Sequence, residues 1–353
     1  MKRWSALAIC LIGITAAGAA VRSAAGLEVK VKKWGFIDKT GEFVIAPQHA
    51  EVHDFSEGLA WARTELGGPV SFIDKGGKVA LETPYNDVGD FHEGLAYVWA
   101  GGKCGYMDST GKLVIPLQFD EAWNFCGGRA RVKVGGWSGK FGYIDKTGTL
   151  VIEAKFNDAN DFVEGRAVVQ VGDKYGVIDE DGKYVVEPTF EWARDFSNGM
   201  AAVRVGGKMG FIDTSGKAVI APQYKQVGDF SEDLAAFRRE IDWGYINKTG
   251  EVVIEDTFRR AEQFREGRAR AARGIDSGFI DTSGAFVIKA EGFNAYADFH
   301  EKLARVDVAL KPAFIDTTGK RVIDVKLEDA GDFHDGLARA AVLPDEKEDK
   351  ETE

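Results

Sequence analysis

The sequence predicts an all-β protein built from tandem repeats, and three recurring features carry this prediction. An Ile-Asp step, first seen at Ile37-Asp38, occurs nine times at spacings of 34 to 37 residues, with Met107 replacing the isoleucine once and Asn247 the acid once. A turn glycine, first at Gly41, and a corner phenylalanine, first at Phe55, keep the same period. A unit of this length cannot bury its own apolar face, so neighbouring copies must stack.

Each repeat begins with a hairpin. The apolar segment before Asp38 and the one from Phe43 to Ile45 predict two strands, and Pro47 marks the end of the second. Asp38 can accept a hydrogen bond from a backbone N–H two residues on, and Gly41 can adopt the left-handed conformation of a bulged turn. The acid and the glycine are therefore expected to build a turn.

A corner and a third strand complete the unit. In the second repeat, the corner at Phe91 is followed by an apolar segment, 95–99. The small residue at this position, Ala96, is alanine in all nine repeats, which predicts close approach of neighbouring backbones around the corner ring. Each unit is thus expected to contain three short strands and a crossover.

The overall shape follows from repeat length and from the chain ends. A propeller blade usually has four strands in 40 or more residues, which favours an elongated, twisted β-solenoid of three-stranded units over a closed, propeller-like toroid. Leu27, Val29 and Val31 suggest an extra strand before the first repeat, and residues 337–343 suggest another after the last. An open array can use both as caps.

The repeats resemble the WG-repeat family of bacterial proteins, named for the Trp-Gly step that opens each unit. The resemblance covers residues 34–338. Only Trp34 and Trp243 keep the tryptophan, and Ser71 and Ala313 replace the glycine in repeats 2 and 9. Ser277 replaces the tryptophan in repeat 8, and repeats 2, 8 and 9 are expected to be the loosest. The resemblance implies an all-β scaffold that binds other macromolecules, with no catalytic residues to carry over.

The chain divides into three parts. Residues 1–25 are predicted to form a secretory signal peptide, because Lys2 and Arg3 precede an apolar stretch that is followed by small residues at which cleavage could occur. Residues 26–343 hold the nine repeats and cap strands, and 344–353 form an acidic tail expected to be disordered. We therefore expect a periplasmic or secreted monomer without stable membrane insertion.

The charge and the motifs of the sequence limit the classes of partner and of chemistry that we expect. The formal net charge is −11, which argues against nucleic acid. No phosphate-binding loop, serine elbow or Cys-x-x-Cys pair is present, so the sequence predicts neither a cofactor nor a catalytic centre. His92, His300 and His334 share the position after the corner phenylalanine, where other repeats carry unrelated residues, and this pattern does not indicate a metal site.

Cys104 and Cys126 both lie in repeat 3 and remain after removal of the signal peptide. In an oxidising compartment they could form a disulfide or stay as two thiols.

Two departures from the repeat are candidate contact sites. A longer hairpin places Trp137 in a glycine-rich loop, where it could be exposed for recognition or fold back on its own repeat. An arginine-rich stretch around repeat 7 could bind a carboxylate- or phosphate-bearing partner, or be an ordinary ion-paired surface. Its candidate contact residues are Arg238, Arg239, Arg259, Arg260 and Arg265.

Two classes of function remain open from the sequence. The preferred interpretation is a non-catalytic exported scaffold that binds a protein or a cell-envelope polymer. The alternative is an enzyme that acts on an envelope polysaccharide through surface carboxylates.

Overall fold

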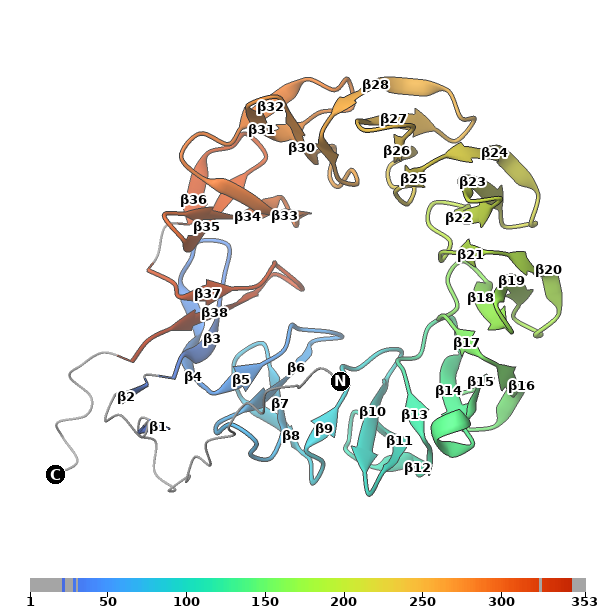
Figure 1. The fold of residues 1–353 in the computed structure, drawn as a ribbon. Helices are drawn as coiled ribbons and strands as arrows, with labels where there is room; N and C mark the ends of the chain where they lie inside the picture. Colours follow the sequence, from blue (N-terminus) through green and yellow to red (C-terminus); the bar gives the residue numbers. More distant parts are fainter. Residues whose placement is uncertain (1–20, 23–27, 30, 324–325, 345–353) are drawn as a thin grey trace, which may run out of the picture.

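The protein is a closed β-propeller of nine blades in a computed structural model that describes residues 21–22, 28–29, 31–323 and 326–344 (Figure 1). Every blade is a four-stranded antiparallel sheet. The all-β class is as predicted, but the elongated array of three-stranded units was wrong. The closed toroid, the less favoured alternative, is the observed shape.

The strands follow one another in chain order in every blade except the first. Blade 1 combines β37 (Asp329–Ala330) and β38 (Ala338–Val342) with β3 (Lys33–Ile37) and β4 (Phe43–His49). Blades 2 to 5 consist of β5 (Glu51–Val52), β6 (Leu59–Arg63), β7 (Ser71–Asp74) and β8 (Val79–Glu82); β9 (Asp87–Val88), β10 (Leu95–Ala100), β11 (Lys103–Asp108) and β12 (Leu113–Phe119); β13 (Glu121–Ala122), β14 (Ala130–Val134), β15 (Lys140–Ile144) and β16 (Leu150–Phe156); and β17 (Asp158–Ala159), β18 (Arg166–Val171), β19 (Lys174–Asp179) and β20 (Tyr184–Phe190).

Blades 6 to 9 continue the same pattern. They consist of β21 (Trp192–Ala193), β22 (Met200–Val205), β23 (Lys208–Asp213) and β24 (Ala218–Tyr224); β25 (Gln226–Val227), β26 (Leu234–Arg238), β27 (Trp243–Asn247) and β28 (Val252–Phe258); β29 (Arg260–Ala261), β30 (Ala269–Arg273), β31 (Asp276–Ile280) and β32 (Phe286–Lys289); and β33 (Asn294–His300), β34 (Leu303–Val308), β35 (Lys311–Asp316) and β36 (Arg321–Ile323). A separate pair, β1 (Val21–Arg22) and β2 (Glu28–Val29), and a short 3-10 helix, η1 (Gly136–Ser138), complete the described elements.

The strand missing from the sequence prediction is the innermost one. Figure 1 shows β13, β17, β21 and β25 toward the centre of the ring and β16, β20, β24 and β28 on its circumference. In eight blades the inner strand has only two residues, such as Trp192–Ala193 in β21. Two residues are too few to show a period-2 pattern, so the sequence does not reveal this strand. Because the strand is so short, a repeat of this length has room for it.

The two ends of the chain close the ring within blade 1. Strand β38 pairs antiparallel with β3 from Lys33↔Val342 to Ile37↔Ala338. The segment 337–343 therefore belongs to a blade and is not a cap. Of the residues assigned to a leading cap, Val29 lies in β2, Val31 is outside any strand, and Leu27 is outside the described residues.

The core is a series of ring contacts between neighbouring blades. The corner phenylalanine of one blade packs on an aromatic residue in the third strand of the preceding blade, as Phe230 does on Phe211 with centroids 4.7 Å apart. Equivalent pairs occur at Phe36–Phe55, Phe72–Phe91, Tyr106–Phe125, Tyr143–Phe162, Tyr245–Phe264, Phe279–Phe299 and Phe314–Phe333. The repeated alanine is buried beside them, with 0% exposure at Ala201. The predicted packing role of both residues is confirmed.

The turn and the Trp-Gly step also have clear structural causes. The Asp38 carboxylate accepts a hydrogen bond from the Thr40 N–H at 2.8 Å, and Gly41 has a φ of 89°. At Gly244 an added Cβ would lie 2.4 Å from the carbonyl oxygen of Ile254 on the outer strand. Only glycine allows this approach, so the glycine of the repeat is required by strand packing.

A second inter-blade contact lies at the corner turns, which we define as the two-residue turns between the inner and second strands. The Glu57 carboxylate accepts hydrogen bonds from the N–H groups of Glu93 and Gly94 on the next blade, at 2.6 and 2.9 Å. Similar bonds link Glu93 to Gly128, Glu164 to Gly199, Glu232 to Gly267, Glu266 to Lys302, Glu301 to Gly336 and Asp335 to Gly58. We call this series the carboxylate relay. Gly127 and Asn198 interrupt it.

No helix in the described part of the chain has the length and apolar character needed to cross a membrane. The predicted signal peptide lies almost wholly outside the described residues, and so does the acidic tail from residue 345.

Candidate binding grooves on the inner wall

A ring of polar residues stands immediately before the corner phenylalanines. Seven blades have aspartate at this position, and blades 4 and 8 have Asn124 and Gln263. The aspartates are Asp54, Asp90, Asp161, Asp195, Asp229, Asp298 and Asp332.

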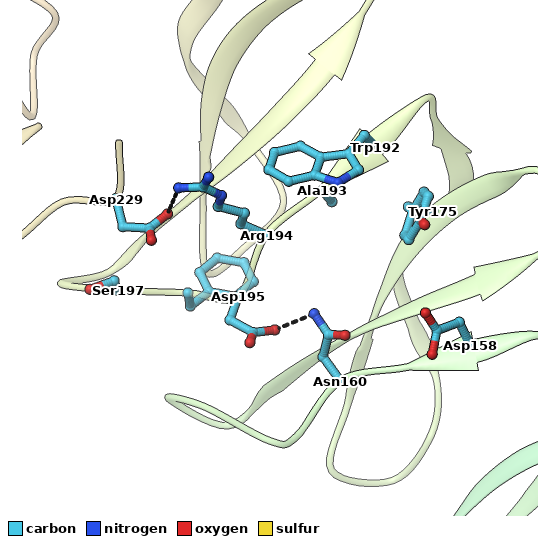
Figure 2. Close-up of a pocket in the computed structure, with 10 residues that line it drawn as sticks. Asp158, Asn160, Tyr175, Trp192, Ala193, Arg194, Asp195, Ser197 and Asp229 are labelled. Carbon is cyan, nitrogen blue, oxygen red and sulfur yellow. Dashed lines mark hydrogen bonds and ion pairs between the residues drawn. The ribbon is translucent and has the colours of Figure 1, made fainter. Parts of the chain in front are cut away.

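Most of these aspartates are bound by a side chain from the preceding blade. Asn160 donates to Asp195 at 2.7 Å, and Arg194 lies 3.2 Å from Asp229, as Figure 2 shows. The same relationship joins His53 to Asp90, Arg131 to Asp161, Arg270 to Asp298 and Arg339 to Asp54. The repeated carboxylates thus cross-link neighbouring blades, which is a structural role.

Two of the aspartates have a raised pKa because their carboxyl groups are buried. Burial raises the pKa of Asp195, although the hydrogen bond from Asn160 opposes the shift. Burial also raises the pKa of Asp161, against the attraction of Arg131. The hydrogen bond to Asp90 raises the pKa of His53, which favours the charged imidazolium form.

Three grooves lie between the inner ends of consecutive blades. The first, of about 350 Å³, lies between blades 5 and 6 and is lined by Asn160, Tyr175, Trp192, Arg194 and Asp195 (Figure 2). The second, of about 410 Å³, lies between blades 6, 7 and 8, and the third, of about 620 Å³, between blades 8 and 9.

The grooves are contiguous because neighbours share lining residues. Arg194 and Asp229 line both the first and the second groove. Arg259 and Arg260 line both the second and the third. They therefore form one surface across blades 5 to 9, which we call the inner-wall arc.

Each groove in the arc combines an arginine with an aromatic ring. The first contains Arg194 and Trp192, whose guanidinium carbon and ring centroid are 5.2 Å apart. Trp243 lines the second and Tyr296 the third. Aromatic faces and guanidinium groups bind flat or anionic groups without bond-making chemistry. The arrangement suits recognition of an elongated ligand.

The predicted arginine cluster separates into three locations. Arg259 and Arg260 line the arc. Arg238 and Arg239 lie at the hairpin between β26 and β27, where Arg239 pairs with Asp256 at 3.2 Å. Arg265 occupies the corner turn of blade 8, 3.7 Å from Asp298. Arg270, which lies in the same arginine-rich stretch of the sequence, also lines the arc, but Trp192, Arg194 and Tyr296 gave no separate signal.

Trp137 lies outside the arc, in the hairpin between β14 and β15, and is 99% exposed. The ring does not fold back on its own repeat. Ile241, Ile275 and Leu310 occupy equivalent hairpins of blades 7, 8 and 9 and are also exposed. These apolar tips were not identified from the sequence, because an isolated apolar residue in a turn resembles the end of a strand.

Both cysteines are free thiols in the structure. Cys104 is buried near the start of β11, whereas Cys126 forms the corner turn of blade 4. Burial raises the pKa of the Cys104 thiol to about 11, which disfavours the reactive thiolate.

His300 and His334 come from neighbouring blades, with ring centroids 5.6 Å apart. Over the described residues, no group of three or more potential ligands forms a metal site.

Comparison with known proteins identifies a matching family model but no match among curated proteins. A family model described as WG containing repeat matches nine segments: residues 34–65, 71–104, 105–136, 141–175, 175–208, 209–240, 243–273, 278–308 and 313–342. Each matched repeat supplies the third and outer strands of one blade and the inner and second strands of the next. The comparison with curated proteins found no match.

Solved structures align with this chain at low similarity. A eukaryotic initiation factor aligns at 10% identity and a TM-score of 0.48, covering 68% of this chain and 77% of that chain. Hsv2 from Kluyveromyces lactis aligns at 11% and 0.35 over 60% and 72%, and a streptogramin B lyase at 13% and 0.30 over 88% and 98%. These values support no inference about activity.

Proposed function

This chain belongs to the WG-repeat family, and we propose that it is a non-catalytic, exported scaffold that binds an elongated partner along the inner-wall arc. The observation that carries the proposal is the continuity of the three grooves through Arg194, Asp229, Arg259 and Arg260. A small substrate needs one enclosed pocket, whereas contiguous open grooves across several blades fit an extended chain. Residues 1–25 support export.

The carboxylates of the inner wall support binding more than catalysis. Acid–base chemistry needs a carboxylate in a distinct environment that is free to exchange a proton with substrate. Asp195 and Asp229 are instead bound by Asn160 and Arg194, and the arrangement recurs around the ring. The raised pKa of Asp195 follows from burial at a blade interface.

The proposal is tested by recovering partners from a cell-envelope extract on the immobilised chain lacking residues 1–25. Asp158→Lys and Arg259→Glu change exposed side chains in the first and third grooves. Lys217→Glu changes an exposed side chain in the turn before the outer strand β24 and serves as the control. We expect the two groove variants to lose partners that wild type and Lys217→Glu retain. Identical recovery on all four proteins would overturn the proposal.

An assay for cleavage of an envelope polysaccharide distinguishes the scaffold hypothesis from the enzyme hypothesis. Cleavage of an envelope polysaccharide by the wild type, abolished by Asp195→Asn alone in a variant whose unfolding midpoint is not lowered, would establish catalysis instead.

A further inference from the structure

The third groove, between blades 8 and 9, carries a concentration of positive charge in an acidic protein. Arg259, Arg260 and Arg270 line it, and its other lining residues include no carboxylate. The chain as a whole has a formal net charge of −11. Glu262 pairs with Arg260 and Asp298 with Arg270, so the positive charge that no carboxylate balances lies at Arg259. We call this the arginine groove.

The three guanidinium groups differ in how firmly they are held. Arg270 donates to Asp298 and to the Tyr296 carbonyl, both at 2.7 Å, and its side chain is only 15% exposed. Arg260 is fixed through Nε by Glu262 at 2.9 Å, which leaves its terminal nitrogens available. Arg259 is exposed and has no side-chain hydrogen bond or ion pair to the described residues. Such oriented guanidinium groups are suited to planar carboxylates.

The groove also offers a flat apolar contact. Tyr296 is 52% exposed, and the neighbouring lining residues Ala271, Ala272 and Ala295 are small. An aromatic face can pack against the C–H face of a sugar ring, while adjacent guanidinium groups bind a carboxylate on the same ring. Asn294 and Ser277 add polar groups that can bond hydroxyls.

The pairing of aromatic ring and arginine recurs along the arc, once in each groove. Trp192 stacks with Arg194 in the first groove, and Trp243 lines the second groove, which the same Arg194 also lines. A ligand with regularly repeated units can meet such contacts in succession. A peptide of varied sequence would present a different side chain at each groove.

We propose that the arginine groove binds a uronate unit of an acidic polysaccharide, whose following units extend along the inner-wall arc. This inference rests on the proposed scaffold function and adds the chemistry of the ligand.

The test measures binding of four probes to the chain lacking residues 1–25 by isothermal titration calorimetry. The probes are oligogalacturonate, oligomannuronate, neutral dextran of matched length and polyglutamate. The groove variants are Arg259→Glu/Arg260→Glu and Tyr296→Ala. The matched control is Arg239→Glu, an exposed arginine outside the groove.

We expect at least one of the two uronate polymers to bind, and dextran and polyglutamate to bind at least about 10-fold more weakly. Loss of two charge-assisted contacts should weaken that binding by about 10-fold or more in the double variant. Tyr296→Ala should weaken it severalfold, and Arg239→Glu by less than about 2-fold.

Three results would overturn the inference. These are no uronate binding, equal weakening by Arg239→Glu and the double variant, and polyglutamate binding as tight as uronate binding with no effect of Tyr296→Ala. If groove-dependent recovery from the envelope extract persists in any of these cases, the scaffold function stands and only the ligand class is wrong.

Discussion

Arg339 lies 3.2 Å from the Asp54 carboxylate, which joins the last strand of the final repeat to the first corner of the chain. The two residues are far apart in sequence but belong to neighbouring blades. With the ladder between β38 and β3, this ion pair makes blade 1 equivalent to the blades formed by consecutive segments. Ring closure therefore uses the same kind of contact as most other blade interfaces.

Closure of this kind predicts that the chain tolerates circular permutation. Pro344 and Val31 lie close together because Val342 pairs with Lys33. Joining them with a short Gly-Ser linker and opening the chain between Gly101 and Gly102, in an exposed hairpin, should give a folded ring. We expect a compact small-angle scattering profile and a urea midpoint close to that of the parent chain lacking residues 1–30. A permuted chain that is extended or aggregated would contradict closure.

The corner phenylalanines should dominate stability. Phe230 is fully buried against Phe211, so Phe230→Ala should lower the free energy of unfolding by about 3–5 kcal/mol. Phe43 is partly exposed, and Phe43→Ala should cost less. Urea unfolding measures both. A loss below about 1 kcal/mol at Phe230 would mean that the inter-blade rings are not the main core.

The carboxylate relay can be completed at its gap in blade 4. Gly127 has a φ of 61°, close to the 52° and 53° of Glu57 and Glu93, and an added Cβ would meet only Phe162 at an ordinary 3.8 Å. Gly127→Glu should place a carboxylate near the Gly165 N–H. Gly127→Ala carries the same left-handed backbone without the carboxylate. We expect the glutamate variant to be more stable than the alanine variant, but by less than about 1 kcal/mol, because the Glu180 carboxylate lies beside Gly165.

The contribution of Glu93 to stability should depend on pH. In the native relay, burial opposes ionisation of Glu93, but Lys146 and the Gly128 N–H outweigh it and lower the pKa of the carboxyl. A carboxyl with a lowered folded pKa stabilises the protein above its unfolded value of about 4.3 and loses this effect as pH falls through the folded value. The difference in stability between wild type and Glu93→Gln should thus be full at pH 7 and shrink in acid. A difference that is constant from pH 7 to pH 3 would show that charge is not its cause.

Asp195 should behave in the opposite way. Burial raises its pKa above the unfolded value of about 3.9, so the ionised side chain reduces stability as pH rises through the interval between the two values. Asp195→Asn removes this effect. The stability of the variant relative to wild type should rise from pH 3 to pH 7 in urea titrations. Asp158→Asn, an exposed carboxylate in the same groove, controls for the lost charge, and a falling difference would contradict the assignment.

Trp137 should contribute recognition surface and little stability. Since the ring is 99% exposed, Trp137→Ser should change the free energy of unfolding by less than about 0.5 kcal/mol. It should also lower the fraction of tryptophan fluorescence that acrylamide quenches. A destabilisation above about 1.5 kcal/mol would indicate that the ring packs on the protein in solution.

The local features of the fold could be predicted from sequence because they depend on neighbouring residues. The Asp38 turn and the buried Phe and Ala of each corner are examples. Repeats 2, 8 and 9 were expected to be the loosest, and the outer strands β8 and β32, which repeats 2 and 8 supply, have four residues each, against seven in β24.

Closure and the inner-wall arc could not be predicted in this way. The pairing of Lys33 with Val342 spans the whole chain, and a terminal strand that completes a blade has the same pattern as one that caps an array. Trp192 and Arg194 occupy repeat positions whose residue types vary, so neither stood out until the fold placed them beside Asp229.

The offset between repeat and blade bears on how such a protein can change in size. Each repeat contributes half of two successive blades, so a duplicated or deleted repeat leaves the complementary halves at the two ends unchanged. The circumference of the ring is then set by the number of repeats and does not depend on the residues that join the first and last blades. A lineage could lengthen or shorten its binding surface one unit at a time while the seam stays the same.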